Sequence, residues 1–225
     1  MFRKLALAAA LTFAALPAQA HFVWVERDGT GPAAAFFGEW DEDVREKSGA
    51  GGHLDMIAGP IAYQADKAKP LAITRGADRI EIAAIGPGDV RFVEDSLKPR
   101  EDKRNGGRTK GVFQAKAGRA DTTAGMDLEL VPLTPNGDVF VLLLRGQPLP
   151  KAEVKLAAPP KWARELHTDD KGQVTFVLPW AGRYVAEVIH VETIKGGEGD
   201  QAYDRIRHVS SLSFVKADGI PWKDQ

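Results

Sequence analysis

Short apolar runs alternate with Gly, Pro, Asp and Asn turns along nearly the whole chain, a pattern that is typical of β-strands. Asp169–Gly172 is predicted as a turn, and the charged segment Ser96–Lys110 as a mobile loop. The pattern contains no heptads and no long helical period. Strands are predicted at 22–26, 79–85, 90–94, 128–131, 139–144, 153–156, 173–178, 184–192 and 208–215.

Strands this short and this regularly spaced predict an all-β fold built from β-sandwich domains. The pattern becomes more regular near residue 128. We therefore expect an N-terminal β-rich domain over residues 21–127 and a C-terminal β-sandwich over residues 128–217, followed by a polar tail over residues 218–225.

The first twenty residues have the three parts of a secretory signal peptide. Arg3 and Lys4 precede the apolar run Leu5–Leu16, and Ala18–Ala20 forms an A-x-A cleavage site. The run is too short to span a bilayer, and no second run of spanning length follows. The sequence therefore predicts a periplasmic protein without a membrane anchor, whose mature chain begins at His21.

Composition narrows the chemistry that this mature chain can perform. Loss of Arg3 and Lys4 leaves 28 basic and 31 acidic residues, a balance that gives no electrostatic reason to bind nucleic acid. The chain has no cysteine, so it has neither disulfides nor thiolate ligands. Motifs for a nucleophilic serine, a zinc protease, a P-loop and a dinucleotide site are absent from the sequence, and we expect no enzymatic activity.

The candidate chemistry lies in histidines. Cleavage would leave His21 with an α-amine beside its imidazole, and the two can chelate one divalent metal. His190 and Glu192 are two apart on one predicted strand and therefore share a face. A hairpin centred near residue 199 would place His208 opposite His190, close enough for both to bind one ion. Glu39 is a candidate carboxylate ligand.

Two further histidines are weaker candidates for this site. His53 follows a glycine-rich run and is expected in a loop, where it can serve as an additional ligand. His167 precedes the predicted turn and is expected to be solvated. Imidazole suits Ni, Co, Cu(II) and Zn alike, so the residues do not select the metal.

Nine segments of the chain occur in the same order in a known family. The chain resembles the NikM-like, nickel-uptake-associated periplasmic domains of unknown function, whose mature chains begin with H-x-x-W-x-E. The segments here are 21–26, 37–39, 128–133, 145–154, 168–176, 181–184, 190–192, 203–208 and 211–214, beginning with His21, Trp24 and Glu26.

The resemblance implies a transthyretin-like or Ig-like sandwich in the C-terminal half. It also implies a role beside nickel or cobalt import, with His21 as a ligand, nickel as the favoured ion and a membrane transporter component as a partner. Family members tied to transporters can carry a C-terminal membrane segment, whereas this chain ends in a polar tail.

Three functions remain open from the sequence. The first is a periplasmic divalent-metal-binding protein that is accessory to nickel or cobalt uptake. The second is a copper protein or oxidative enzyme in which His21 and another histidine form a brace. The third is a structural or adhesive β-sandwich module that binds no metal.

Overall fold

The computed structural model describes residues 21–158 and 162–221. The predicted signal peptide, the cleavage site and the last residues of the predicted tail lie outside these ranges. The described chain is all-β, as the sequence predicts, with two single-turn 3-10 helices, Leu54–Met56 and Gly199–Gln201. Neither of these described helices is long or apolar enough to cross a membrane.

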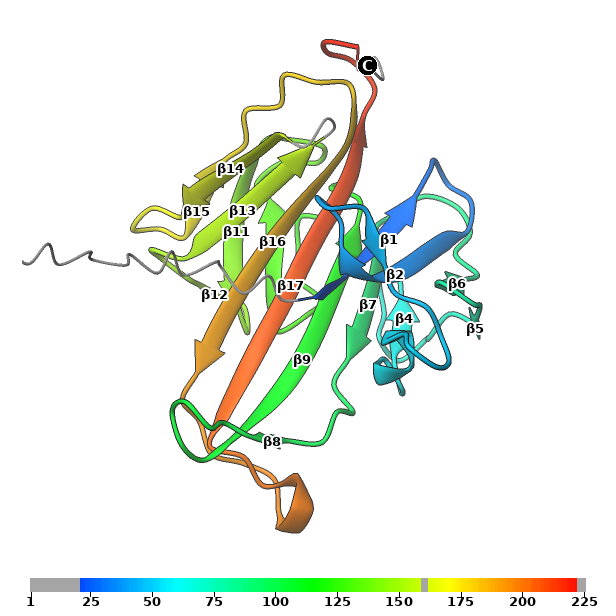
Figure 1. Ribbon diagram of the computed structural model, residues 1–225. Coiled ribbons are helices and arrows are strands. Elements are labelled where there is room, and N and C mark those ends of the chain that lie inside the picture. The colour runs from blue at the N-terminus through cyan, green and yellow to red at the C-terminus, as the bar shows by residue number, and fades with distance from the viewer. Residues whose placement is uncertain (1–20, 159–161, 222–225) are drawn as a thin grey trace, which may run out of the picture.

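An eight-stranded central sheet runs through the middle of the molecule (Figure 1). Its strand order is β14-β13-β16-β17-β9-β7-β4, with β8 paired to β9. The β17–β9 pair is parallel and the others are antiparallel. The strands are β4 Ile61–Tyr63, β7 Val90–Glu94, β8 Arg100–Glu101, β9 Arg108–Ala117, β13 Glu153–Ala158, β14 Trp162–His167, β16 Gly182–Glu192 and β17 Arg205–Lys216.

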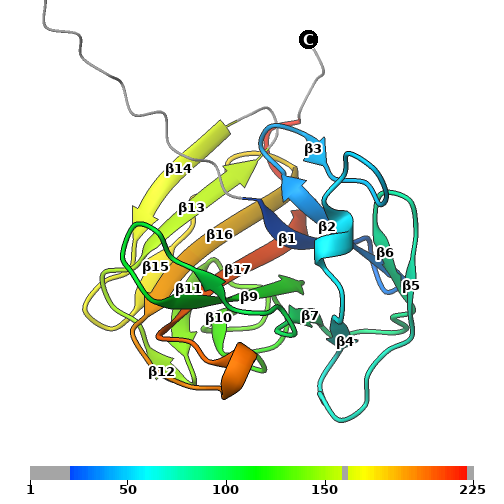
Figure 2. The ribbon, with the colours of Figure 1, turned by 60° about the horizontal axis from the view of Figure 1, so that its bottom comes forward.

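A smaller sheet packs on each face of the central sheet (Figure 2). The N-terminal sheet contains β1 Phe22–Arg27, β2 Ala33–Glu39, β3 Val44–Arg45, β5 Ile73–Arg75 and β6 Ile80–Ile82. The C-terminal sheet contains β10 Leu128–Pro132, β11 Val139–Leu144, β12 Gln147–Pro148 and β15 Gln173–Thr175.

Alternate residues of the central strands fill two hydrophobic cores. On β16, Val185 packs in the core beneath the N-terminal sheet, whereas Tyr184 and Ala186 pack in the core beneath the C-terminal sheet. On β17, Val209 and Leu212 divide in the same way. This follows from strand geometry, because successive side chains point to opposite faces of a sheet.

The predicted division near residue 128 stays a prediction. The two cores draw mainly on residues before and after that position respectively. The central sheet, however, takes strands from both sides, because β9 pairs in parallel with β17 along nine residue pairs.

The Asp169–Gly172 turn forms as predicted. The Asp169 carboxylate accepts hydrogen bonds from the backbone N–H groups of Lys171 and Gln173, both at 2.8 Å. The predicted mobile loop Ser96–Lys110 was partly wrong, because it contains β8 and the first residues of β9. These segments pair with each other, Arg100 with Thr109 and Glu101 with Arg108.

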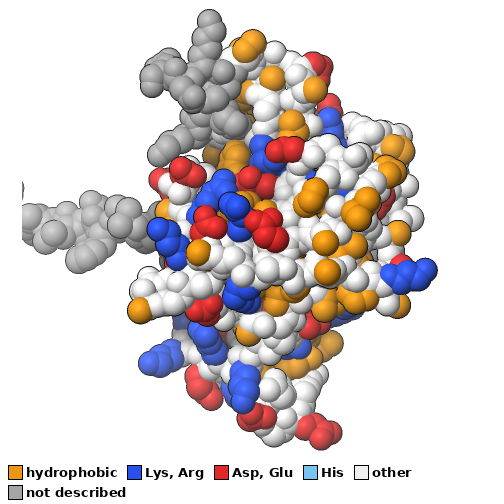
Figure 3. Space-filling view, turned by 90° about the vertical axis from the view of Figure 1, so that its right-hand side faces the viewer, with side chains coloured by type: hydrophobic (Ala, Val, Ile, Leu, Met, Phe, Trp, Pro, Cys, Tyr) orange, Lys and Arg blue, Asp and Glu red, His pale blue; other side chains and the backbone are white. Residues whose placement is uncertain are grey.

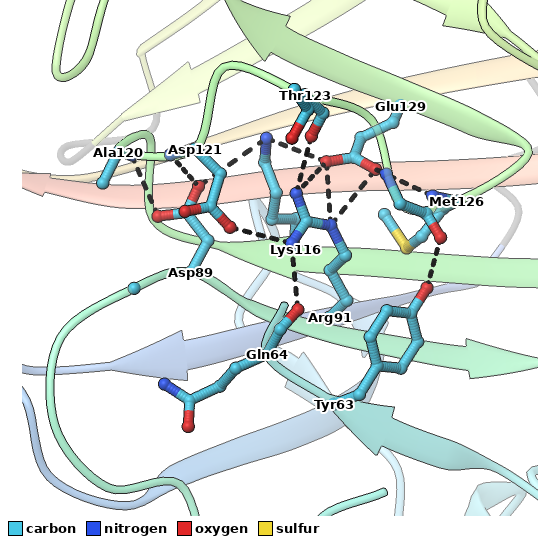
Figure 4. A network of polar contacts seen from close by, with 12 residues as sticks. Tyr63, Gln64, Asp89, Arg91, Lys116, Ala120, Asp121, Thr123, Met126 and Glu129 are labelled. Carbon is cyan, nitrogen blue, oxygen red and sulfur yellow. Dashed lines mark hydrogen bonds and ion pairs between the residues drawn. The ribbon is translucent and has the colours of Figure 1, made fainter. Parts of the chain in front are cut away.

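A buried polar network joins the central sheet to the start of the C-terminal sheet (Figure 4). Arg91 and Lys116 are 3% and 1% exposed, and Glu129, at 1%, lies 2.9 and 3.1 Å from their nitrogens. Asp89 and Asp121 complete the network. On the outer face shown in Figure 3, basic and acidic side chains are interspersed rather than segregated.

Candidate metal centre

His21 stands at the start of β1 with a carboxylate at each ring nitrogen. Its Nδ1 lies 3.3 Å from Glu39 Oε1, and its Nε2 lies 2.5 Å from Glu46 Oε1. The ring is 30% exposed, while the two carboxylates are only 16% and 14% exposed. Phe37 packs against the ring with a centroid distance of 5.4 Å. The imidazole is therefore held in one orientation near the surface.

Glu46 also contacts the loop that carries His53. Its Oε2 accepts a hydrogen bond from the His53 backbone N–H at 3.0 Å, and the His53 ring centroid lies 6.2 Å from that of His21. Burial by itself would raise the pKa of Glu46, but the hydrogen bonds from His21 and His53 outweigh it and lower that pKa. Glu46 is therefore an anion that connects the two histidines.

Close backbone packing brings these residues together. Gly38 pairs with Phe22 on β1 and with Arg45 on β3, so Glu39 follows directly beside His21. The backbone N–H of Glu46 donates a hydrogen bond to the Phe37 carbonyl at 2.8 Å. This hydrogen bond holds Glu46 beside β2 and close to His21.

The hairpin predicted for His190 and His208 is confirmed, because the two residues are directly paired between β16 and β17. His208 is fully buried, and its Nε2 lies 3.4 Å from Glu192 Oε2. Glu192 also accepts hydrogen bonds from Arg145 at 2.6 and 2.8 Å. Contact with Arg145 is the main reason that the pKa of Glu192 is lowered.

The structure divides the predicted site residues between the two faces of the central sheet. The Ser211 hydroxyl donates to the carbonyl of Val23 on β1 at 2.7 Å, so odd-numbered β17 residues face the N-terminal sheet. His208 therefore projects from the other face, together with His190 and Glu192. His21 lies instead with Glu39, Glu46 and His53.

A third group lies at the edge of the central sheet. Glu153 on β13 pairs with His167 on β14, and Glu165 is two residues before His167 on the same face. One ligand atom from each residue lies within 4.8 Å of the others, and all three side chains are exposed. Among the described residues, this is the one group of three such side chains that could hold a metal ion.

The two carboxylates beside His21 have different roles. A carboxylate cannot donate a hydrogen bond, so each ring nitrogen of His21 faces an acceptor that favours a proton or a metal on that nitrogen. The nitrogens point in opposite directions, so Glu39 can share an ion with Nδ1, whereas Glu46 can only orient the ring through Nε2.

Sequence reasoning missed three residues of these groups. Glu46 lies in the charged run Arg45–Lys47, which looks like an exposed turn. Glu153 and Glu165 look like solvated strand residues, and only the pairing of β13 with β14 brings them to His167. A search for carboxylates two residues from a histidine would have found Glu165.

The comparisons with known proteins match one family. A family model described as a domain of unknown function, DUF4198, covers residues 18–192. Neither a curated protein nor a solved structure matches the chain. Because the match spans most of the chain, the protein belongs to the DUF4198 family.

Proposed function

We propose that the mature protein is a periplasmic, non-enzymatic binder of a divalent transition metal, with the ion held at its N-terminal residue. The observation that carries this proposal is the His21 imidazole between two carboxylates, with Nδ1 3.3 Å from Glu39 and Nε2 2.5 Å from Glu46. Signal-peptide cleavage before His21 would free the α-amine next to that ring.

The ligands would be the α-amine and Nδ1 of His21 together with Glu39. Glu46 would accept the Nε2 proton, the arrangement in which a carboxylate fixes the tautomer and orientation of a metal-bound histidine. His53 is the candidate for a further ligand, because its ring lies at the edge of the same group.

This ligand set of nitrogen and carboxylate oxygen suits Ni, Co, Cu(II) and Zn. The resemblance to NikM-like domains favours nickel, with cobalt as the second choice. It also supports a role in delivering the ion to a separate membrane transporter component.

Thermal unfolding tests the proposal on two chains, one beginning at His21 and one with an extra glycine before it. A ligand that binds only the folded state stabilises it by about 2.7 kcal/mol at a hundred times its Kd. We expect one of Ni, Co, Cu(II) or Zn to raise the Tm of the first chain, and this rise to disappear in the second.

A His167→Ala variant distinguishes the edge group from the N-terminal one. The metal-dependent rise in Tm should persist in this variant. A rise that survived the added glycine but vanished in His167→Ala would place the ion at the edge of the central sheet. The absence of a rise with every metal would favour a structural module.

Glu46→Gln tests the orienting role of the carboxylate. Loss of a carboxylate that fixes a metal-bound histidine usually lowers metal affinity about 10- to 100-fold, and we expect this range by calorimetry. Glu101→Gln is the matched control, because Glu101 is exposed on β8. Equal affinities of the two variants would contradict the role of Glu46.

A further inference from the structure

The C-terminal sheet leaves part of the central sheet uncovered, and a cavity of about 240 Å³ lies there. Val112 on β9 with Ile206 and His208 on β17 are among the residues that line it. The start of β10 contributes Asp127, and the turn after β11 contributes Arg145. This cavity is on the opposite face of the sheet from His21.

His208, which lines this cavity, has a buried ring nitrogen without a hydrogen-bond partner among the described residues. The ionised Glu192 beside it can only accept a hydrogen bond, so Nε2 carries the proton between them. Burial lowers the pKa of His208, which favours the neutral ring. Its Nδ1 then has a lone pair, and this buried atom has no partner among the described residues.

A cation without a carboxylate partner lies at the same cavity. Lys110 makes no ion pair with any described residue, and its Nζ lies 6.0 Å from the centroid of the Tyr203 ring. Arg145, in contrast, is occupied by Glu192. The cavity thus has a free positive charge from β9 and a free acceptor from β17.

A metal ion would fit this cavity poorly. The lining carries three cationic side chains, Lys67, Lys110 and Arg145, against the two carboxylates Asp95 and Asp127, so its formal charge is positive and disfavours a cation. A ligand that is negative at one end and donates a hydrogen bond from the other would satisfy both unused groups.

We infer that this cavity binds a small carboxylic acid with a hydroxyl or amino group on its α-carbon. The carboxylate would pair with Lys110, and the α-substituent would donate a hydrogen bond to Nδ1 of His208. The cavity is smaller than the roughly 300–1,000 Å³ of pockets for drug-sized ligands, which favours a ligand of few atoms. Asp95 and Asp127 in the lining can accept further hydrogen bonds from an amino group.

Three acids with the same carbon skeleton test this inference, namely propionate, lactate and alanine. Backbone amide shifts of the chain from His21 are followed by NMR during each titration, without added metal. We expect lactate or alanine to bind at least about fivefold more tightly than propionate, because a net hydrogen bond contributes about this much. The shifts should centre on Val112, Gln114 and Ile206.

Two variants assign the contacts. His208→Leu should abolish the preference over propionate, and Lys110→Met should weaken binding of all the acids that bind. Lys110 is partly exposed, so its variant keeps the test decisive if His208→Leu does not fold. Lys103→Met, on a surface loop away from this cavity, is the control.

Equal binding of propionate would overturn the inference, as would binding that is unchanged in Lys110→Met. If no acid shifts the cavity resonances, the inference is wrong. None of these outcomes bears on a metal at His21, which lies on the other face of the sheet.

Discussion

Glu187 is a carboxyl group that faces the N-terminal sheet from the middle of β16. Burial raises its pKa to about 7, although Lys155 and Arg207 on the neighbouring strands act to lower it. Asp41 and Glu39 add to the rise.

The pH dependence of stability should report this group. The folded-state pKa of about 7 is above the ordinary value of 4.5, so the native state holds the proton more tightly. The stabilisation of the folded state by protonated Glu187 is complete below about pH 4.5 and is lost as the pH rises through 7. The free energy of unfolding falls by at most about 3 kcal/mol over this range.

Glu187→Gln should remove this contribution. Urea unfolding at pH 5 and pH 8 measures it, with the wild-type chain losing more stability between the two values than the variant. Parallel losses would show that Glu187 ionises without cost in the folded protein.

At the scale of elements, β2 and β3 form the support for the proposed site. Gly38 has a φ of +146°, and a Cβ at this position would clash with the Val44 carbonyl oxygen. The same glycine pairs with β1 on its other side. Only glycine allows β1, β2 and β3 to approach closely enough to place Glu39 and Glu46 around His21.

Gly38→Ala should therefore damage both stability and metal binding. We expect a loss of at least about 2 kcal/mol in the free energy of unfolding, because both backbone strain and a steric clash oppose the added methyl group. Gly31→Ala, in the turn before β2, is the control, since a Cβ there meets no atom within 4 Å. Urea unfolding compares the two, and equal stability would contradict the packing argument.

At the scale of the molecule, the buried network around Glu129 connects the central and C-terminal sheets (Figure 4). Burial opposes ionisation of Glu129, but Lys116 and Arg91 outweigh it and lower its pKa. Glu129 also accepts the backbone N–H groups of Gly125 and Met126, at 2.7 and 2.9 Å. Glu129 therefore contacts both buried cations, and Asp121 and Asp89 supply the further carboxylates at Arg91 and Lys116.

Glu129→Ala should destabilise the protein by about 3–5 kcal/mol, the usual cost of leaving a buried charge without its partner. The exposed Glu101→Ala should change stability by less than about 0.5 kcal/mol. Chemical unfolding measures both. A small effect of Glu129→Ala would mean that water reaches Arg91 and Lys116.

Local patterns were sufficient for much of this fold. The strand before the loop was predicted from its apolar residues, and a hairpin loop assumed to be centred near residue 199 predicted the pairing of His190 with His208, which the structure confirms. The Asp169 turn could be predicted equally well, because its hydrogen bonds join residues that are two and four positions apart. Such features depend on residues that are close in the sequence, so one sequence is enough to predict them.

β9 shows why other parts were not predicted. Its apolar residues Phe113 and Ala115 alternate with Gln114 and Lys116, so it resembles a strand exposed on one face or a polar loop. In the structure it lies in the middle of the central sheet, with Lys116 1% exposed. A buried lysine is tolerated only because Glu129, from a distant strand, is beside it.

The sequence by itself determined the all-β class, the strong turns and the candidate role of His21, whereas the register that pairs His190 with His208 was assumed and then found in the structure. The tertiary structure decided which residues share a site. It placed Glu46 at His21, left His208 on the opposite face and brought Glu153 to His167. Successive side chains of a strand face opposite sides of the sheet, and this alternation can be predicted from the sequence. Which residues each side contacts depends on how whole sheets pack together.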